Sequence, residues 1–321
     1  MLKYLVVLLD DTSVSYCHYE NQKNERKLIA LEDLRAGILF AMKQNLMIQF
    51  VYPDYELPQE YKDAIHSIDH ANIVPASLTK EADVVVVDGL TDENPEEYRG
   101  ASAVVFRVQK DELFADYKCL IPFLEKLERL NVVITDVETF SDDNLQTYQA
   151  LLSDLLEVVE SEYTKGHAVQ FNLLTDRMML SAMNNCNAGD ENITLAPDGK
   201  FYVCPAFYQA ETATTIEVKA QCIGDLKSGL NVRNPQLYKL SHAPICRNCD
   251  AYQCKRCVWL NRKMTLEVNT PSHEQCIVAH TERNVSRNLL QNISKQGVFM
   301  SEIEIKEIAY LDPFDNKEEW Q

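Results

Sequence analysis

Four cysteines crowd into twelve residues near the C-terminal end of this chain, and that density limits what the segment can fold into. They follow the pattern Cys246-x2-Cys249-x4-Cys254-x2-Cys257. The segment 244–257 otherwise offers one Ile, one Ala and one Tyr for packing, so it cannot build a hydrophobic core of its own. Soft thiolates at this density are explained by ligation of a metal ion or an iron–sulfur cluster. The segment therefore predicts a metal site.

Three further cysteines extend the set of candidate ligands. Two short β segments, 192–195 and 200–203, are joined by Ala-Pro-Asp-Gly, in which Pro at the second and Gly at the fourth position suit a type I turn. Because the hairpin folds back on itself, the cysteines that flank it lie at its open end and can share one site. The last cysteine follows the four-cysteine segment after eighteen residues. We therefore predict seven metal ligands, which are Cys186, Cys204, Cys246, Cys249, Cys254, Cys257 and Cys276.

The distribution of cysteines predicts both a domain boundary and a cellular compartment. Only Cys17 and Cys119, of ten cysteines, precede residue 180, so the composition changes there. The apolar run 5–9 is too short for a signal peptide and is followed at once by two aspartates. No apolar stretch approaches the length that spans a bilayer. We expect a cytoplasmic protein without a membrane partner, whose cysteines are ligands or buried thiols rather than disulfides.

Charge restricts the partners of the chain. Its net charge of -18, from 49 acidic and 31 basic residues, argues against nucleic acid, whose backbone is bound by cationic groups. One segment departs from this balance, because residues 231–263 hold seven Lys and Arg and a single acid. Basic neighbours would stabilise an anionic four-thiolate cluster. The simpler interpretation of these charges is a solvated basic face.

The first 180 residues alternate short Val/Ile-rich runs with helical patterns. Such an order predicts an α/β fold whose parallel sheet is linked by βαβ crossovers, either open or curled as a partial (β/α)6-type barrel. An active site would then lie at the C-terminal ends of the strands. Near the C-terminus we expect a helix at 280–294 and an acidic strand at 301–311. We predict strands at 4–9, 47–52, 83–88, 103–108, 131–136 and 168–173, and helices at 31–44, 58–68, 114–130 and 142–163.

The cysteine layout resembles the SPASM domain, a seven-cysteine module that binds two auxiliary [4Fe-4S] clusters. The resemblance rests on Cys186-x12-Gly199-x4-Cys204, the four-cysteine segment and the last cysteine, together with an Ile-Gly-Asp-Leu turn at 223–226. It covers about the last third of the chain, and the x4 and x2 gaps are each one residue shorter than usual. It implies one cluster on Cys246, Cys249, Cys254 and Cys276, and three corners of a second on Cys186, Cys204 and Cys257.

The fourth corner of the second cluster is open in this resemblance. Many family members carry an additional cysteine where Leu180 and Ser181 stand here. The corner is then either free for an exogenous ligand or occupied by Cys222. Tetrahedral zinc on four thiolates is the alternative to iron–sulfur, although zinc ribbons separate their Cys-x2-Cys pairs by roughly 15 to 20 residues rather than four.

The loop after the first strand resembles a degenerate radical-SAM motif. That family places Cys-x3-Cys-x2-Cys there, and the segment 16–21 resembles the end of the motif with Cys17 as its third cysteine. Asp10 and Val14 stand at the other two positions. The resemblance therefore implies no S-adenosylmethionine (SAM) cleavage in the usual way. The plain interpretation of Cys17 is a lone loop thiol.

A SPASM-like half behind a degenerate N-terminal half resembles the CXXX repeat peptide maturases. This implies a radical-SAM-like domain at 1–180, a SPASM-like domain at 181–280, and a helix and tail at 281–321. The implied function is maturation of a small, ribosomally made Cys-repeat peptide, with an electron donor as a second partner. The alternative is a non-catalytic scaffold with structural iron–sulfur or zinc. We assign no role to His167, Asp136, Asp88 or Glu138, and we expect Cys119 to be a buried, inert thiol.

Overall fold

A single curved sheet organises the chain in the computed structural model, which describes residues 2–80, 82–91, 94–210 and 222–299. The strand order is β11-β10-β9-β8-β1-β2-β3-β4-β5-β6-β7, so the sheet does not close on itself. Neighbouring strands from β8 through β1 to β7 run parallel, and β9 to β11 add an antiparallel edge. The predicted α/β fold with a large parallel sheet is confirmed.

The strands are short and rich in Val and Ile, as buried parallel strands are. Their bounds are β1 Tyr4–Leu8, β2 Met47–Val51, β3 His70–Pro75, β4 Val84–Asp88, β5 Ala103–Val108, β6 Arg129–Ile134, β7 Gln170–Phe171, β8 Asn192–Leu195, β9 Lys200–Tyr202, β10 Cys222–Asp225 and β11 Gly229–Leu230.

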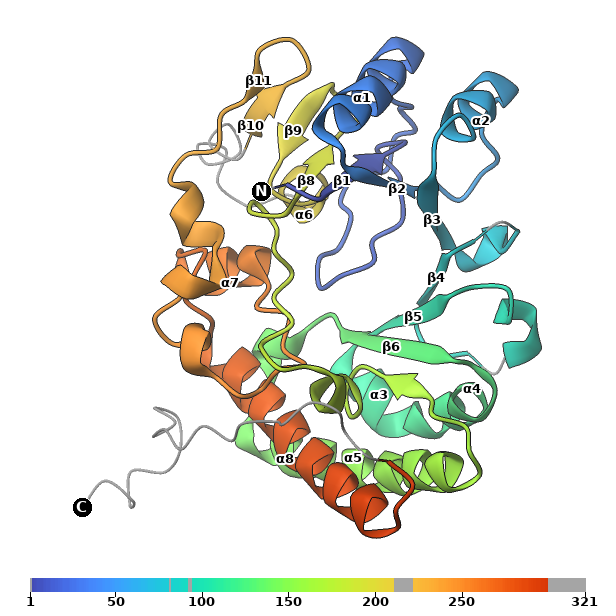
Figure 1. Ribbon diagram of the computed structural model, residues 1–321, viewed down its shortest axis with the longest axis vertical. Coiled ribbons are helices and arrows are strands. Elements are labelled where there is room, and N and C mark those ends of the chain that lie inside the picture. The colour runs from blue at the N-terminus through green and yellow to red at the C-terminus, as the bar shows by residue number, and fades with distance from the viewer. Residues whose placement is uncertain (1, 81, 92–93, 211–221, 300–321) are drawn as a thin grey trace.

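Helices cover the outer side of the curved sheet, and the two longest lie side by side below it (Figure 1). Helix α5 begins at a capping box formed by Ser141 and Asn144, as its sequence favours. The helices are α1 Leu31–Gln44, α2 Gln59–Ile65, α3 Lys110–Asp116, α4 Ile121–Lys126, α5 Asp142–Thr164, α6 Ala206–Gln209, α7 Val258–Thr265 and α8 His273–Lys295. Short 3-10 turns connect several of them.

Several predicted elements are corrected by the structure. Strand β3 was not predicted, because it has few apolar residues and ends in a proline. The single helix predicted at 114–130 is divided into α3, a 3-10 turn at Tyr117–Leu120 and α4, where Pro122 suits the first turn of a new helix. The strand predicted at 168–173 is reduced to β7, and the helix predicted at 280–294 begins earlier, at His273. The strand predicted at 301–311 lies outside the described residues.

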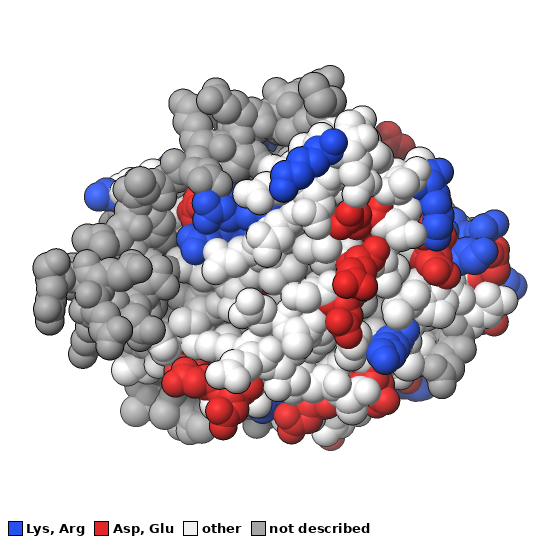
Figure 2. Space-filling model, turned by 90° about the horizontal axis from the view of Figure 1, so that it is seen from below, with Lys and Arg blue, Asp and Glu red and all other residues white. Residues whose placement is uncertain are grey.

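The sheet continues across residue 180, where the cysteine distribution predicts a boundary. Strand β8 pairs in parallel with β1, with Asn192 opposite Tyr4 and Leu195 opposite Val7. The loop after β1 and the cysteine-rich second half therefore lie on neighbouring parts of one sheet. None of the described helices combines the length and the apolar character that crossing a membrane requires. On the face shown in Figure 2, acidic and basic side chains surround a broad area without charge.

Candidate metal centre

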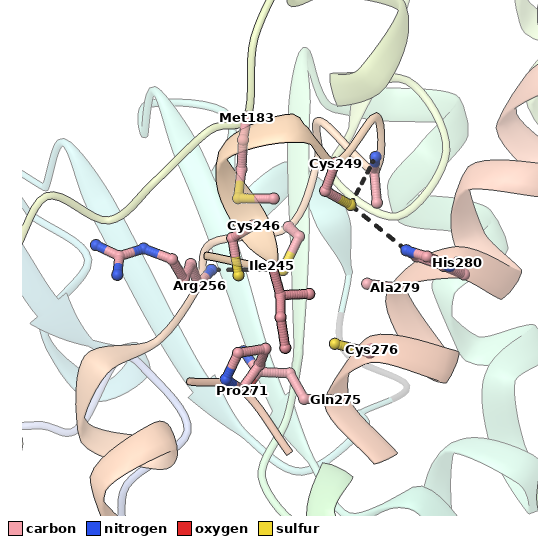
Figure 3. Close-up of a pocket in the computed structure, with 12 residues that line it drawn as sticks. Met183, Ile245, Cys246, Cys249, Arg256, Pro271, Gln275, Cys276, Ala279 and His280 are labelled. Carbon is pink, nitrogen blue, oxygen red and sulfur yellow. Dashed lines mark hydrogen bonds between the residues drawn. The ribbon is translucent and has the colours of Figure 1, made fainter. Parts of the chain in front are cut away.

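Four of the predicted ligands surround one small cavity. Cys246, Cys249, Cys254 and Cys276, which we call the first thiol group, all line it, together with Arg256 (Figure 3). Three of them come from a segment of turns, and Cys276 comes from the first turn of α8. These are the four residues that the SPASM resemblance assigns to one cluster. Whether they bind a metal remains a prediction.

Backbone N–H groups point at the sulfurs of this segment. The N–H of Ala251 donates to Sγ of Cys249 at 3.4 Å, and the N–H of Arg256 donates to Sγ of Cys254 at 3.4 Å. The ring Nε2 of His280 also lies 3.4 Å from Sγ of Cys249 (Figure 3). Hydrogen bonds to sulfur stabilise the thiolate form and tune the reduction potential of a bound cluster. The donor groups thus fit an iron–sulfur cluster.

A buried arginine lies at the edge of this cavity, with its backbone beside the thiols and its guanidinium directed away from them (Figure 3). Arg256 is fully buried, and its backbone has a φ of 45°. Residues other than Gly adopt this left-handed conformation at an energetic cost. Its Nε donates to Oδ1 of Asn185 at 2.6 Å, and Nη2 donates to the carbonyl of Tyr238. Its Nη1 has no hydrogen-bond partner among the described residues. Its positive charge opposes the effect of burial on the pKa of Cys246 and so favours an anion near that thiol.

The other three predicted ligands line a second, larger cavity. Cys186, Cys204 and Cys257, which we call the second thiol group, lie around a cavity of about 470 Å³ inside the curve of the sheet. Cys257 is the N-cap of α7 and accepts the N–H of Leu260 at 3.5 Å. Cys222, the predicted alternative for the fourth corner, lies instead in β10, where its thiol donates to the carbonyl of Gly224 at 3.3 Å.

Cys17 also lines this larger cavity, beside the second thiol group. The sequence predicts a lone thiol or a remnant of the motif, since Cys17 lies 169 positions before Cys186. The parallel pairing of β8 with β1 is the signal that brings the two together. The other two positions of the N-terminal motif are occupied by structural groups. Asp10 accepts hydrogen bonds from Thr12 and from the hydroxyl of Tyr55, and Val14 packs against the core.

Burial dominates the acid–base behaviour of the thiols. It raises the pKa of Cys17 to about 12, with Cys186 adding to the effect and Lys255 and Arg107 opposing it. Burial likewise raises the pKa of Cys254 to about 12 and that of Cys246 to about 11. Free thiols with such pKa values stay protonated at neutral pH, so metal binding must release their protons.

The thiols of each group line a shared cavity, but they are not arranged to bind a single metal ion. In the ranges that the structure describes, no three His, Cys, Asp or Glu side chains are arranged to hold one metal ion. Tetrahedral zinc would need sulfurs about 3.8 Å apart, given a Zn–S bond of about 2.3 Å. A four-iron cluster binds each cysteine through a separate iron, so its ligand sulfurs lie further apart.

The remaining candidates make structural contacts. Asp88 pairs with Arg107, Glu138 pairs with Lys263, and Asp136 accepts the N–H of Lys110 at 2.8 Å at the start of α3. The Nδ1 of His167 lies 3.2 Å from Glu162. Cys119 was predicted to be buried in a helix, but it is partly exposed in the 3-10 turn at Tyr117–Leu120 because the predicted helix is broken there.

Comparison with known proteins identifies the fold and nothing finer. No family model matches the chain, and no curated protein matches it in sequence. Native anSMEcpe with bound AdoMet and Cp18Cys peptide has a TM-score of 0.62 at 11% identity, covering 92% of this chain and 100% of that chain. A hexahistidine-tagged form of anSMEcpe with bound AdoMet has a TM-score of 0.61 at 11% identity, covering 92% and 96%. The chain therefore shares the overall fold of anSMEcpe.

Proposed function

We propose that this protein is a radical-SAM-like iron–sulfur protein that matures a small, ribosomally made peptide. The observation that carries the proposal is the first thiol group, which the chain assembles around one cavity from residues up to 30 positions apart. One [4Fe-4S] cluster would be held by these four thiolates. A second would be held by Cys186, Cys204 and Cys257 with a further ligand. When bound, the clusters supply electron transfer or direct ligation of a substrate thiol.

The peptide partner is supported by the fold. Both anSMEcpe structures that share this fold contain bound AdoMet, and the native one also contains the Cp18Cys peptide. In this chain several strands of the sheet line the larger cavity, including β1 with Tyr4 and Val6 and β6 with Asn131 and Val133. Apolar walls with a few polar groups suit an extended peptide segment. A Cys-repeat peptide would bring its own thiols to the second thiol group.

The chain's own residues prepare the first thiol group for an anion. Backbone N–H groups donate to Cys249 and Cys254, and Arg256 supplies a fixed positive charge beside them. We propose that residues 181–280 form the ligand-bearing SPASM-like part, that 1–180 form the peptide-binding part, and that 281–321 form the C-terminal helix and tail. Helix α8 spans the second of these divisions and carries Cys276 on its N-terminal side.

Metal and sulfide analysis tests this proposal. After anaerobic reconstitution with iron and sulfide, the protein is expected to hold roughly eight irons with equal acid-labile sulfide. Zinc without sulfide, in protein that was offered iron, would replace the clusters by a structural zinc site. A protein that retains no metal after desalting would contradict both.

The N-terminal loop is expected not to support reductive SAM cleavage. Asp10 is committed to Thr12 and Tyr55, and Val14 offers no ligand, so the loop lacks the three closely spaced thiolates of that chemistry. The reconstituted protein should form no 5'-deoxyadenosine with SAM and a strong reductant, compared with a cluster-free control. Formation of the product, abolished in Cys17→Ala, would contradict this expectation.

A non-catalytic scaffold is the second candidate. The hydrogen bond of Asp10 and the core packing of Val14 favour it, because neither residue is then free to bind a cluster in the N-terminal loop. Such a protein would hold fully ligated metal that stays silent in a redox titration. Clusters that are reduced reversibly, or that change spectrum when a Cys-repeat peptide is added, would favour the maturase.

A further inference from the structure

Five thiols line the larger cavity, and apart from Cys254 of the first thiol group they come from four different segments. Cys17 comes from the loop after β1, Cys186 from the segment before β8, Cys204 from the end of the β8–β9 hairpin, and Cys257 from the start of α7. Each of the four side chains lines the same cavity. The resemblance to SPASM domains accounts for three of them and leaves one corner without a ligand.

Hydrogen bonds hold the segment of Cys186 against the segment of Cys257. The N–H of Cys186 donates to the carbonyl of Lys255 at 2.8 Å, and its thiol donates to the carbonyl of Arg256 at 3.9 Å. Two of the C-terminal thiols therefore come from segments that contact each other at the wall of this cavity.

The loop that carries Cys17 is held rigidly. The buried side chain of Arg107, on β5, donates from Nε to the carbonyl of Cys17 at 3.0 Å and from Nη2 to the carbonyl of Tyr19 at 2.6 Å. Between them, Nδ1 of His18 lies 2.8 Å from the carbonyl of Ile134 at the end of β6. A ligand on a loop fixed at three consecutive residues needs little reorganisation to bind.

The same loop is tied to the C-terminal ligands. The hydroxyl of Tyr19 donates to Oε1 of Gln209, five residues after Cys204, at 2.9 Å. The ring of Tyr19 also packs edge-on against Trp259, two residues after Cys257, with centroids 6.3 Å apart. The segments that bear two of the C-terminal thiols therefore contact the residue next but one to Cys17.

We propose that Cys17 is the fourth ligand of the second thiol group, so that Cys17, Cys186, Cys204 and Cys257 form a four-thiolate cluster site that joins the N-terminal loop to the C-terminal half. This inference rests on the proposed clusters but concerns only the identity of the ligands. It assigns Cys17 to a different site from the one that its motif position implies. It also closes the corner that Cys222 was expected to fill or that an exogenous ligand was expected to take.

Substitution of single cysteines tests the assignment. In the full chain, reconstituted anaerobically, Cys17→Ser should lose up to half of about eight irons, and the reduced protein should show a changed or missing electron paramagnetic resonance signal for one of two clusters. Cys222→Ser is the matched control for the rival corner, and Cys119→Ser controls for loss of an N-terminal thiol. Both should retain the iron and the spectrum of the wild type. Full iron and an unchanged spectrum in Cys17→Ser would overturn the assignment.

Thiol protection in the wild type covers the case in which Cys17→Ser fails to fold. The loaded protein and the same protein treated with a chelator are exposed to N-ethylmaleimide, and the labelled positions are read by mass spectrometry. Cys17 should be protected only in the loaded protein, together with Cys186, Cys204 and Cys257, whereas Cys119 should be labelled in both. Both states are labelled at the same partly denaturing urea concentration, so that burial alone does not shield Cys17, and equal labelling of Cys17 in the two states would then overturn the assignment.

The two proposals fail in different ways. If the wild type holds about eight irons and Cys17→Ser holds as many, the clusters stand and the Cys17 assignment falls. If the wild type takes zinc without sulfide, the iron–sulfur proposal falls, and the ligand set is still supported when Cys17→Ser loses one of two zinc ions. If the wild type binds no metal, both are overturned.

Discussion

The two thiol groups differ in how the chain assembles them. Three members of the first group lie within nine consecutive residues, and the fourth follows 22 positions later in α8. Cys17, Cys186, Cys204 and Cys257 line the larger cavity from positions 17 to 257, and the pairing of β8 with β1 brings the N-terminal one near the others. The spacing of the sequence predicts a local group of thiols. It does not predict a group that is assembled by sheet topology, and such a group depends on the fold of both halves.

Breaking the local group should have the largest effect. Cys249→Ala removes one of the four thiols of the first group and leaves the second group unaltered. Iron should fall by about half, and the segment 246–257 should become sensitive to protease, because a segment with little core depends on its metal for folding. Iron per chain and limited proteolysis provide the measurement. Cys119→Ala, a substitution outside both groups, should match the wild type in both, and an unchanged Cys249→Ala would show that this residue is no ligand.

The sequence predicted the features that depend on neighbouring residues and missed those that depend on residues far apart in the chain. Helix α1 has the predicted bounds, Leu31–Gln44, since its apolar spacing and its αL C-cap at Asn45 are local features. The gathering of the first thiol group was likewise implied by spacing. Strand β3 was missed, because its place between β2 and β4 is fixed by neighbours rather than by its own residues. The position of Cys17 beside the second thiol group was missed for the same reason.

A substitution in the N-terminal half alone should reduce metal binding at the second thiol group. Arg107→Met keeps the volume of the side chain but removes the donors to the carbonyls of Cys17 and Tyr19. Hydrogen bonds from a charged donor contribute about 1.5 to 3 kcal/mol each, so the loss of two should lower the free energy of unfolding by about 3 to 6 kcal/mol. Chemical denaturation measures this loss, and iron analysis should show a deficit confined to the second site. A deficit in the first site instead would contradict the independence of the two groups.

A buried carboxyl group lies at the wall of the larger cavity and gives the smallest effect. Burial raises the pKa of Glu282 to about 7 from 4.5, although Tyr148 donates to Oε1 at 2.8 Å and Gln253 to Oε2 at 3.2 Å. Between these two pKa values the folded protein binds more protons than the unfolded chain. The contribution of Glu282 to stability is therefore lost as the pH rises from about 4.5 through 7, by at most about 3 kcal/mol.

Glu282→Gln should remove this dependence, because an amide accepts the hydrogen bond from Tyr148 at every pH. Relative to the wild type, the variant should gain about 1 to 3 kcal/mol between pH 5 and pH 8. Glu162→Gln is a control of opposite sign: burial opposes ionisation of Glu162, but hydrogen bonds from Lys165 and His167 outweigh it and lower its pKa. That variant should lose stability relative to the wild type as the pH rises from the lowered folded pKa to the unfolded value of about 4.5, and the difference should stay constant above it. Denaturation curves for the three proteins from about pH 3 to pH 8 measure both slopes. Parallel curves for Glu282→Gln and the wild type would show that Glu282 ionises normally and that the cavity wall is wet.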